Sequence, residues 1–346
     1  MIAKESFSLE HTQRFRKGRR VDPILLERNI YALGLVEALV RVGMPFIFKG
    51  GTSLTLLLEK PRRLSTDVDI IVEPGTDVMG YLNEAKKIFP FKEMEEQSRK
   101  GKNDIVKQHF KFWYDSPMKS GSLYILLDVL YGETAYSAIT AKEITNEFLI
   151  TEPPLTEVTM PTIDCILGDK LTAFAPRTTG IPFGVDKELE IIKQMYDVSV
   201  LTDESRGFSD VRESYMRTVA DEIAYRGLTI NPEEVLHDTF ESASCIATRG
   251  ALYEDDYPNY LDGIHKIVNY IYSERFSGEK AITAACKVMY ISACVMKNIE
   301  HRIITDTKKY MDERILLAEY KKLGTLRKLD LEAYAYAVEA IKTIDR

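Results

Sequence analysis

Two aspartates one residue apart, Asp67 and Asp69, open a run that stays apolar through Ile70-Ile71-Val72. A short run of this kind is typical of a strand that enters a buried sheet. Side chains at positions i and i+2 of a strand point to one face, so we expect the two carboxylates to converge. Neighbouring carboxylates repel each other unless a cation lies between them, and hard oxygen ligands suit Mg²⁺, with Mn²⁺ as the alternative.

A glycine pair precedes these acids. Phe46-Ile47-Phe48 has the pattern of a short buried strand, and residues 52–59 have that of a helix. Between them, glycines remove side chains where backbone must pass close to an anion, and the following helix offers free N–H groups. The residues predicted to bind the phosphates of a nucleoside triphosphate (NTP) are Lys49, Gly50, Gly51, Thr52 and Ser53. The order of strand, glycine pair, helix and acid-bearing strand is more specific than any one piece.

Strand and helix patterns mix up to about residue 160. Further strands are predicted at 107–114 and 122–130, with an edge strand at 148–150. Beyond residue 160 the patterns are helical, at 161–174, 187–201, 208–226, 232–247, 257–275, 281–300, 307–322 and 329–344. The predicted fold class is therefore α/β (α+β) with a mixed sheet, followed by an all-helical region. We predict one domain at 1–205, with its core at about 24–160, and a helical domain at 206–346.

At this point the sequence resembles a known family. Lys49-Gly50-Gly51-Thr52-Ser53-Leu54, followed by the segment 63–70 (RLSTDVDI), is similar to the AbiEii/AbiGii-type toxins of bacterial abortive-infection systems. These belong to the nucleotidyltransferase superfamily with the DNA polymerase beta-like fold. The resemblance covers roughly residues 30–205. It implies a polymerase beta-like nucleotidyltransferase domain.

The resemblance also implies further site residues. Asp128, a single acid in an apolar run, matches the third metal carboxylate, beside Asp67 and Asp69. Lys170 matches a lysine that contacts the triphosphate, and Asp197 an acid that is either the general base or an organiser of the site. Asp128 could instead be a hydrogen-bonded structural residue. Without the resemblance, Lys170 and Asp197 would be read as ordinary helix-surface residues.

The implied reaction is transfer of a nucleoside monophosphate from an NTP, with release of pyrophosphate. The resemblance implies a toxin that acts on RNA, first of all the tRNA 3′ end, and a cognate antitoxin encoded nearby. Two rival hypotheses stay open. The acceptor could be a small molecule such as an antibiotic, or a protein side chain; or the domain could be a catalytically degenerate binding module.

Charge gives a weaker indication. The formal net charge is −7, which disfavours non-specific nucleic-acid binding. A local basic cluster is nevertheless present, with Arg14, Arg16, Lys17, Arg19 and Arg20. It is interpreted either as a solvated arm or as a phosphate-binding arm.

Other classes of site are not indicated. The four cysteines lack CxxC spacing, which favours reduced thiols. His109 has no His, Cys or acidic partner at metal-ligand spacing, and no P-loop or GxSxG motif is present. No apolar stretch approaches the roughly 20 residues of a transmembrane helix, and no signal peptide is recognised. A cytoplasmic protein without membrane contact is predicted.

Overall fold

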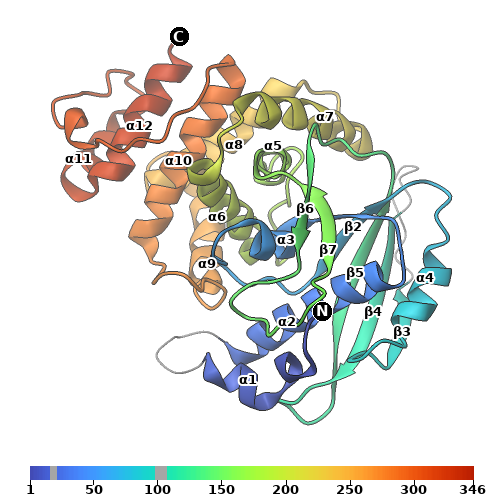
Figure 1. Ribbon diagram of the computed structural model, residues 1–346. Coiled ribbons are helices and arrows are strands. Elements are labelled where there is room, and N and C mark those ends of the chain that lie inside the picture. Colours follow the sequence, from blue (N-terminus) through green and yellow to red (C-terminus); the bar gives the residue numbers. More distant parts are fainter. Residues whose placement is uncertain (16–21, 98–106) are drawn as a thin grey trace. The chain divides into compact units, whose positions relative to one another are not determined.

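The chain falls into two compact units, seen in a computed structural model that describes residues 1–15, 22–97 and 107–346 (Figure 1). The first unit holds residues 1–134, 138–162 and 269–275. The second holds residues 135–137, 163–268 and 276–346.

The first unit is built on a five-stranded mixed sheet with strand order β1-β2-β5-β4-β3. β2 and β5 run parallel, and the other neighbouring pairs run antiparallel. The strands are β1 (Ile47–Lys49), β2 (Val68–Val72), β3 (Glu93–Gln97), β4 (Lys107–Asp115) and β5 (Ser122–Tyr131). A separate hairpin pairs β6 (Ile139–Glu143) with β7 (Glu157–Pro161). The helices are η1 (Lys4–Phe7), α1 (Leu9–Arg14), α2 (Pro23–Arg41), α3 (Gly50–Leu57) and α4 (Val78–Ala85).

One face of this sheet is the core of the unit. Alternate residues of β4, namely Phe110, Phe112 and Tyr114, are fully buried on it. α2 packs against β2 and β5. This helix begins at Pro23, after an N-cap in which the Asp22 carboxylate accepts a 2.8 Å hydrogen bond from the Ile24 amide. The opposite face carries the polar residues of β2, β4 and β5.

The second unit is helical. Its elements are α5 (Ile163–Ala173), α6 (Glu188–Glu204), α7 (Phe208–Arg226), α8 (Pro232–Ala247), η2 (Glu254–Asp256), α9 (Tyr257–Ile267), α10 (Gly278–Lys297), η3 (Lys308–Tyr310), η4 (Lys321–Thr325), α11 (Leu326–Leu329) and α12 (Leu331–Ile344). α5 packs against α6, α7 and α8. The mixed sheet and the helical C-terminal region are thus confirmed. The compact units change over near residue 162, whereas the domain boundary at residue 205 stays a prediction.

Three local predictions are wrong, and three strands were not predicted. Residues 148–150 form no strand, because they follow a turn in which the Leu149 amide donates to the Asn146 carbonyl at 3.1 Å and the Phe148 amide donates to the Asn146 side chain at 2.9 Å. β3 and the hairpin β6–β7 were not predicted. β3 and β6 are mostly exposed and lack an apolar face, whereas β7 buries Val158 and Met160. The helix predicted at 257–275 ends at Ile267, and residues 269–275 join the first unit. Residues 307–322 form only short 3₁₀ turns, and Leu316 is 81% exposed where a helix would have to bury it.

Every helix among the described residues is too short or too polar to cross a lipid bilayer.

Candidate active site

A row of four polar side chains crosses the open face of the sheet. The strand register pairs Lys49 with Asp69 and Asp69 with Asp128. It then pairs Asp128 with His109 on β4. Directly paired residues of neighbouring strands point to the same face. The four side chains therefore lie side by side and line a cavity of about 190 Å³, together with Lys107.

The acids of this row are neighbours through the sheet and not through the sequence. Asp69 lies in the middle of β2, and Asp128 lies in the middle of the parallel strand β5. Both side chains are half-buried. Two carboxylates placed side by side need a cation or hydrogen-bond donors between them. The structure thus brings Asp69 and Asp128 together, as the sequence hypothesis requires.

Asp67 lies at the start of the acid-bearing strand, and its predicted convergence with Asp69 on a metal ion stays a prediction. It precedes the first residue of β2 and lies outside the described lining of the cavity. Its carboxylate is 51% exposed and lies 3.7 Å from the Arg28 guanidinium on α2. Its carbonyl oxygen accepts a 2.5 Å hydrogen bond from the Thr52 hydroxyl. Asp67 therefore borders the row, next to the start of α3.

The glycine pair lies directly against the acids. Gly50 has φ +81°, and a Cβ atom added to it would lie 2.0 Å from Oδ2 of Asp69. A Cβ atom on Gly51 would lie 2.6 Å from the Arg63 guanidinium. Only glycine permits both the left-handed backbone and the close approach at position 50. The first turn of α3 is thereby held against the carboxylate of Asp69.

The two hydroxyls after the glycines have structural partners. The Thr52 hydroxyl donates to the Asp67 carbonyl, and the Ser53 hydroxyl donates to the Gly50 carbonyl at 2.8 Å. Both side chains are fully buried. The Thr52 bond ties α3 to the residue before β2, and the Ser53 bond lies within the first turn of α3. A contact from Thr52 or Ser53 to phosphate stays a prediction.

His109 has the acidic partner that its sequence spacing did not reveal. Its Nδ1 atom lies 2.6 Å from Oδ1 of Asp128. The two residues are 19 positions apart, and only the antiparallel register of β4 and β5 joins them. The single acid in the apolar run of β5 and the polar residues that alternate along β4 were the signals that could have pointed to this pair.

A segment from far along the chain supports the lead-in to β2. The Leu64 amide donates to the Tyr270 carbonyl at 2.8 Å, and the Tyr272 amide donates to the Arg62 carbonyl at 2.9 Å. The Arg63 side chain is buried and donates to the Leu64 carbonyl at 3.1 Å. The segment Arg62–Leu64, which the sequence singled out, is thus held by backbone bonds.

In the helical unit, Lys170 and Asp197 form a buried ion pair. The Lys170 ammonium on α5 lies 3.1 Å from the Asp197 carboxylate on α6. It also donates to the Gln194 side chain at 2.7 Å. The Asp197 side chain is only 1% exposed. The interpretation of both as helix-surface residues is therefore wrong, because helix packing buries them together.

Removing one member of this pair should destabilise the helical unit. We expect Asp197→Asn to lower the free energy of unfolding by about 3–5 kcal/mol, because Lys170 would be left buried without its carboxylate. Urea unfolding followed by circular dichroism measures this change. The exposed α7 pair Glu213–Arg217 is the control, and Glu213→Gln should cost less than about 1 kcal/mol. A loss for Asp197→Asn as small as the control would show that the pair does not hold α5 to α6.

The fit of a metal ion can be judged from these residues. Within 1–15, 22–97 and 107–346, no three His, Cys, Asp or Glu side chains are grouped so that they could hold a metal ion. Mg²⁺ commonly takes one or two carboxylates and completes its shell with water and substrate phosphate. Asp69 and Asp128, with Gly50 and the start of α3 beside them, fit that pattern. Of the predicted basic cluster, Arg16, Lys17, Arg19 and Arg20 lie outside the described residues.

Comparisons with known proteins give one family match and two similar solved structures. Residues 35–268 match a family model described as the nucleotidyl transferase AbiEii toxin of a Type IV TA system. Two crystal structures from Helicobacter pylori are also similar. JHP933 is 12% identical, with a TM-score of 0.43 over 79% of this chain and 94% of that chain. A candidate nucleotidyltransferase is 13% identical, with a TM-score of 0.45 over 80% and 99%. The chain matches none of the curated proteins.

Proposed function

Because the chain belongs to the AbiEii family of nucleotidyltransferase toxins, we propose that it transfers a nucleoside monophosphate from an NTP to the 3′ end of an RNA, with tRNA as the first candidate. The enzyme class and the toxin–antitoxin context follow from the family. The observation that supports the chemistry is the approach of Gly50 to Asp69, with Asp128 beside it.

The transfer forms one bond and breaks one bond. The acceptor hydroxyl oxygen attacks the α-phosphorus, the bond from the α-phosphorus to the bridging oxygen breaks, and pyrophosphate leaves. We propose that the backbone N–H groups at Gly50 and Gly51 bind the triphosphate tail. Lys49 places a positive charge beside Asp69 on the same face. Such reactions depend mainly on positioning and electrostatics, which this row of side chains would supply.

We propose that Asp69 and Asp128 hold Mg²⁺, with Asp67 at the border of the site. A bound divalent ion would neutralise the triphosphate and activate the acceptor hydroxyl. His109 would orient Asp128 by donating its Nδ1–H to the carboxylate at 2.6 Å. In the helical unit, the burial of Asp197 against Lys170 supports the organiser role over the general-base role.

The role of His109 can be tested through the metal alone. We expect His109→Ala to weaken Mn²⁺ binding roughly 10-fold to 100-fold, because partners that orient a ligand carry that much of the affinity. Calorimetric titration without NTP measures it. His109→Asn keeps an N–H donor and should recover part of the loss. His237, which lies exposed on α8, provides the control variant His237→Ala. Equal Mn²⁺ affinity in His109→Ala and in the wild type would contradict the role.

The proposed function is tested by incubating the protein with each α-labelled NTP and Mg²⁺, together with total RNA. We expect label in RNA of tRNA size, and no label after chelation of the metal ion. Parallel incubations replace RNA with protein or with small cationic antibiotics. Label that enters only those acceptors would overturn the RNA assignment while leaving the enzyme class unchanged.

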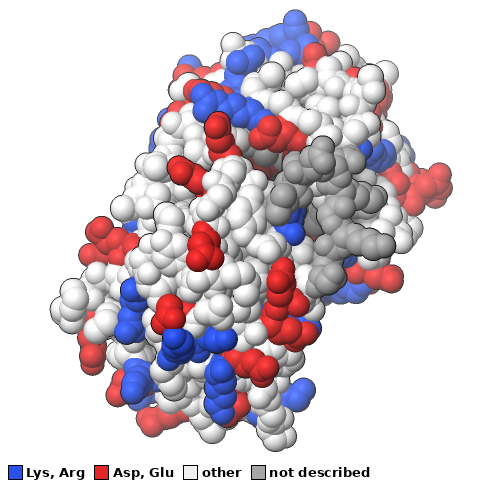
Figure 2. Space-filling model, turned by 90° about the vertical axis from the view of Figure 1, so that its right-hand side faces the viewer, with Lys and Arg blue, Asp and Glu red and all other residues white. Residues whose placement is uncertain are grey.

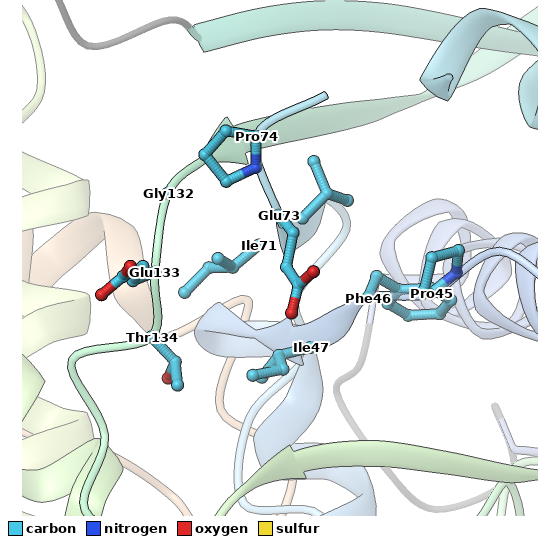
Figure 3. A pocket seen from close by; sticks show the side chains of 10 residues that line it. Pro45, Phe46, Ile47, Ile71, Glu73, Pro74, Gly132, Glu133 and Thr134 are labelled. Atoms are coloured by element: carbon cyan, nitrogen blue, oxygen red, sulfur yellow. The ribbon is translucent and has the colours of Figure 1, made fainter. Parts of the chain in front are cut away.

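The small-molecule alternative has one observation in its favour. A pocket of about 650 Å³ lies beyond the C-terminal ends of β2 and β5, and it is lined by apolar residues and two glutamates. Figure 3 shows that the Glu73 side chain extends toward Ile47, whereas Glu133 points away. A single inward carboxylate is a modest attraction for a cationic drug. RNA therefore remains the favoured acceptor.

A further inference from the structure

The open face of the sheet carries a second group of side chains beyond the acids. Three sheet residues, Lys111, Trp113 and Tyr124, together with Arg28 from α2, are defined here as the cation–aromatic strip. On β4, Lys111 and Trp113 follow His109 at alternating positions, so they share its face. Tyr124 precedes Asp128 by four residues on β5 and is paired directly with Trp113. Four residues of a strand span about 13 Å, so the strip begins within a few nucleotides of the acids.

The two rings of the strip pack edge to face. The centroids of Trp113 and Tyr124 are 5.1 Å apart at an interplanar angle of 63°. Both side chains are half-buried, while Phe112, Tyr114 and Ile125 on the other face are fully buried. Aromatic side chains that keep part of a ring exposed on a sheet face can stack with nucleobases.

Two cations accompany the rings. The Lys111 ammonium lies 4.9 Å from the Tyr124 centroid and 5.7 Å from the Trp113 centroid. The Arg28 guanidinium lies 5.9 Å from the Tyr124 centroid and 3.7 Å from Asp67. Arg28 thus connects the rings with the acids. Cations beside exposed rings supply the charge that a nucleic-acid backbone needs, next to the surface that its bases need.

Acidic side chains border the strip on one side. On β3, exposed Glu93 and Glu95 are paired with Trp113 and Lys111. These carboxylates repel a polyanion from the outer edge of the sheet. Elsewhere, on the face drawn in Figure 2, acidic and basic side chains are intermixed. Negative charge therefore borders the strip on its β3 side.

We propose that the cation–aromatic strip binds the last unpaired nucleotides of the acceptor RNA, with a base stacked on Trp113 or Tyr124 and phosphates beside Lys111 and Arg28. This inference rests on the proposed transfer to RNA and adds the surface that holds the acceptor. It assigns the strip to single-stranded RNA and not to the NTP, because the glycine pair lies at the opposite edge of the sheet, beside β1 and β2.

The chain contains its own reporter for this site, because Trp113 is its only tryptophan. We expect a short single-stranded RNA, titrated without NTP or metal, to quench the tryptophan fluorescence in a saturable manner. NTP alone, at the same nucleotide concentration, should leave the fluorescence unchanged. Absence of quenching by RNA, or stronger quenching by NTP, would overturn the proposal.

Variants separate stacking from charge. In fluorescence anisotropy with a labelled oligonucleotide, Trp113→Ala and Tyr124→Ala should each weaken binding roughly 10-fold to 100-fold. Trp113→Phe and Tyr124→Phe keep a ring and should bind within about 3-fold of wild type. If the alanine variants melt early, Lys111→Gln still tests the strip. It should reduce the slope of log affinity against log salt by about 0.7, whereas Lys142→Gln on β6 should not.

Failure of this inference can be told apart from failure of the proposed function. Quenching by RNA without any labelling of RNA would support RNA binding by the strip and contradict the proposed transfer to RNA. Labelling of RNA without quenching, and with full activity in Tyr124→Ala, would support the reaction and overturn the strip.

Discussion

Asp69→Asn is expected to abolish nucleotidyl transfer, with a loss of roughly 10³-fold or more, while the protein stays folded. Removal of one preorganised charge from a reaction of this type commonly costs about 10²–10³-fold, and a lost metal ligand adds to that. Asp69 is half-buried in the middle of the row, between Lys49 and Asp128, so neither neighbour can take its place. The amide has nearly the same shape, so the sheet should remain intact.

The measurement is incorporation of label from α-labelled NTP into RNA, with circular dichroism melting as the test of folding. Asp128→Asn should show a loss of similar kind. The control is Glu84→Gln on α4, which removes one exposed carboxylate of the same unit. If Asp69→Asn incorporated label into RNA at the same rate as Glu84→Gln, the assignment of the row as the active site would be refuted.

Gly50→Ala is expected to inactivate the enzyme even though it changes no charged group. The added Cβ would collide with the Asp69 carboxylate at 2.0 Å, in a backbone with φ +81°. The strained backbone alone costs about 1–3 kcal/mol. The collision must also displace either the first turn of α3 or the Asp69 side chain. We expect a loss of transfer of roughly 10²-fold or more, together with weaker NTP binding.

Gly75→Ala is the matched control for this prediction. Gly75 also has a positive φ, of +90°, but nothing lies within 4 Å of an added Cβ. Both variants therefore carry backbone strain, and only Gly50→Ala carries the collision. Comparison of their melting temperatures and transfer rates isolates the collision. Equal transfer rates in the two variants would show that the close approach of Gly50 to Asp69 is not needed for activity.

Much of the local structure could be predicted from the sequence. The Asp22-Pro23 start of α2, the strand β2 after Asp67 and the glycine-led helix α3 all follow from short-range physics: caps, fixed φ angles and apolar alternation. β3 and β6 could not be predicted in this way. Their residues are mostly exposed, so no apolar period marks them, and they exist because neighbouring strands complete their hydrogen bonds.

The same distinction between local and long-range signals applies to the candidate site. The acid pair and the glycine pair lie close together in the chain, so residue types and spacing were enough to propose them as site residues. The partnership of His109 with Asp128 and the burial of Lys170 against Asp197 were not readable. Each joins residues from different strands or helices, and nothing in either local sequence specifies the other.

The sequence by itself determined which segments become strands and helices around the glycine turn, and which side chains can bear the chemistry. Only the tertiary structure decided the order β1-β2-β5-β4-β3 and its register, and hence that Lys49, Asp69, Asp128 and His109 stand in one row. The physical reason is the distance along the sequence over which each effect acts. Local propensities act within a few residues, whereas the register of a sheet is set by the burial of one whole face, to which distant segments contribute together.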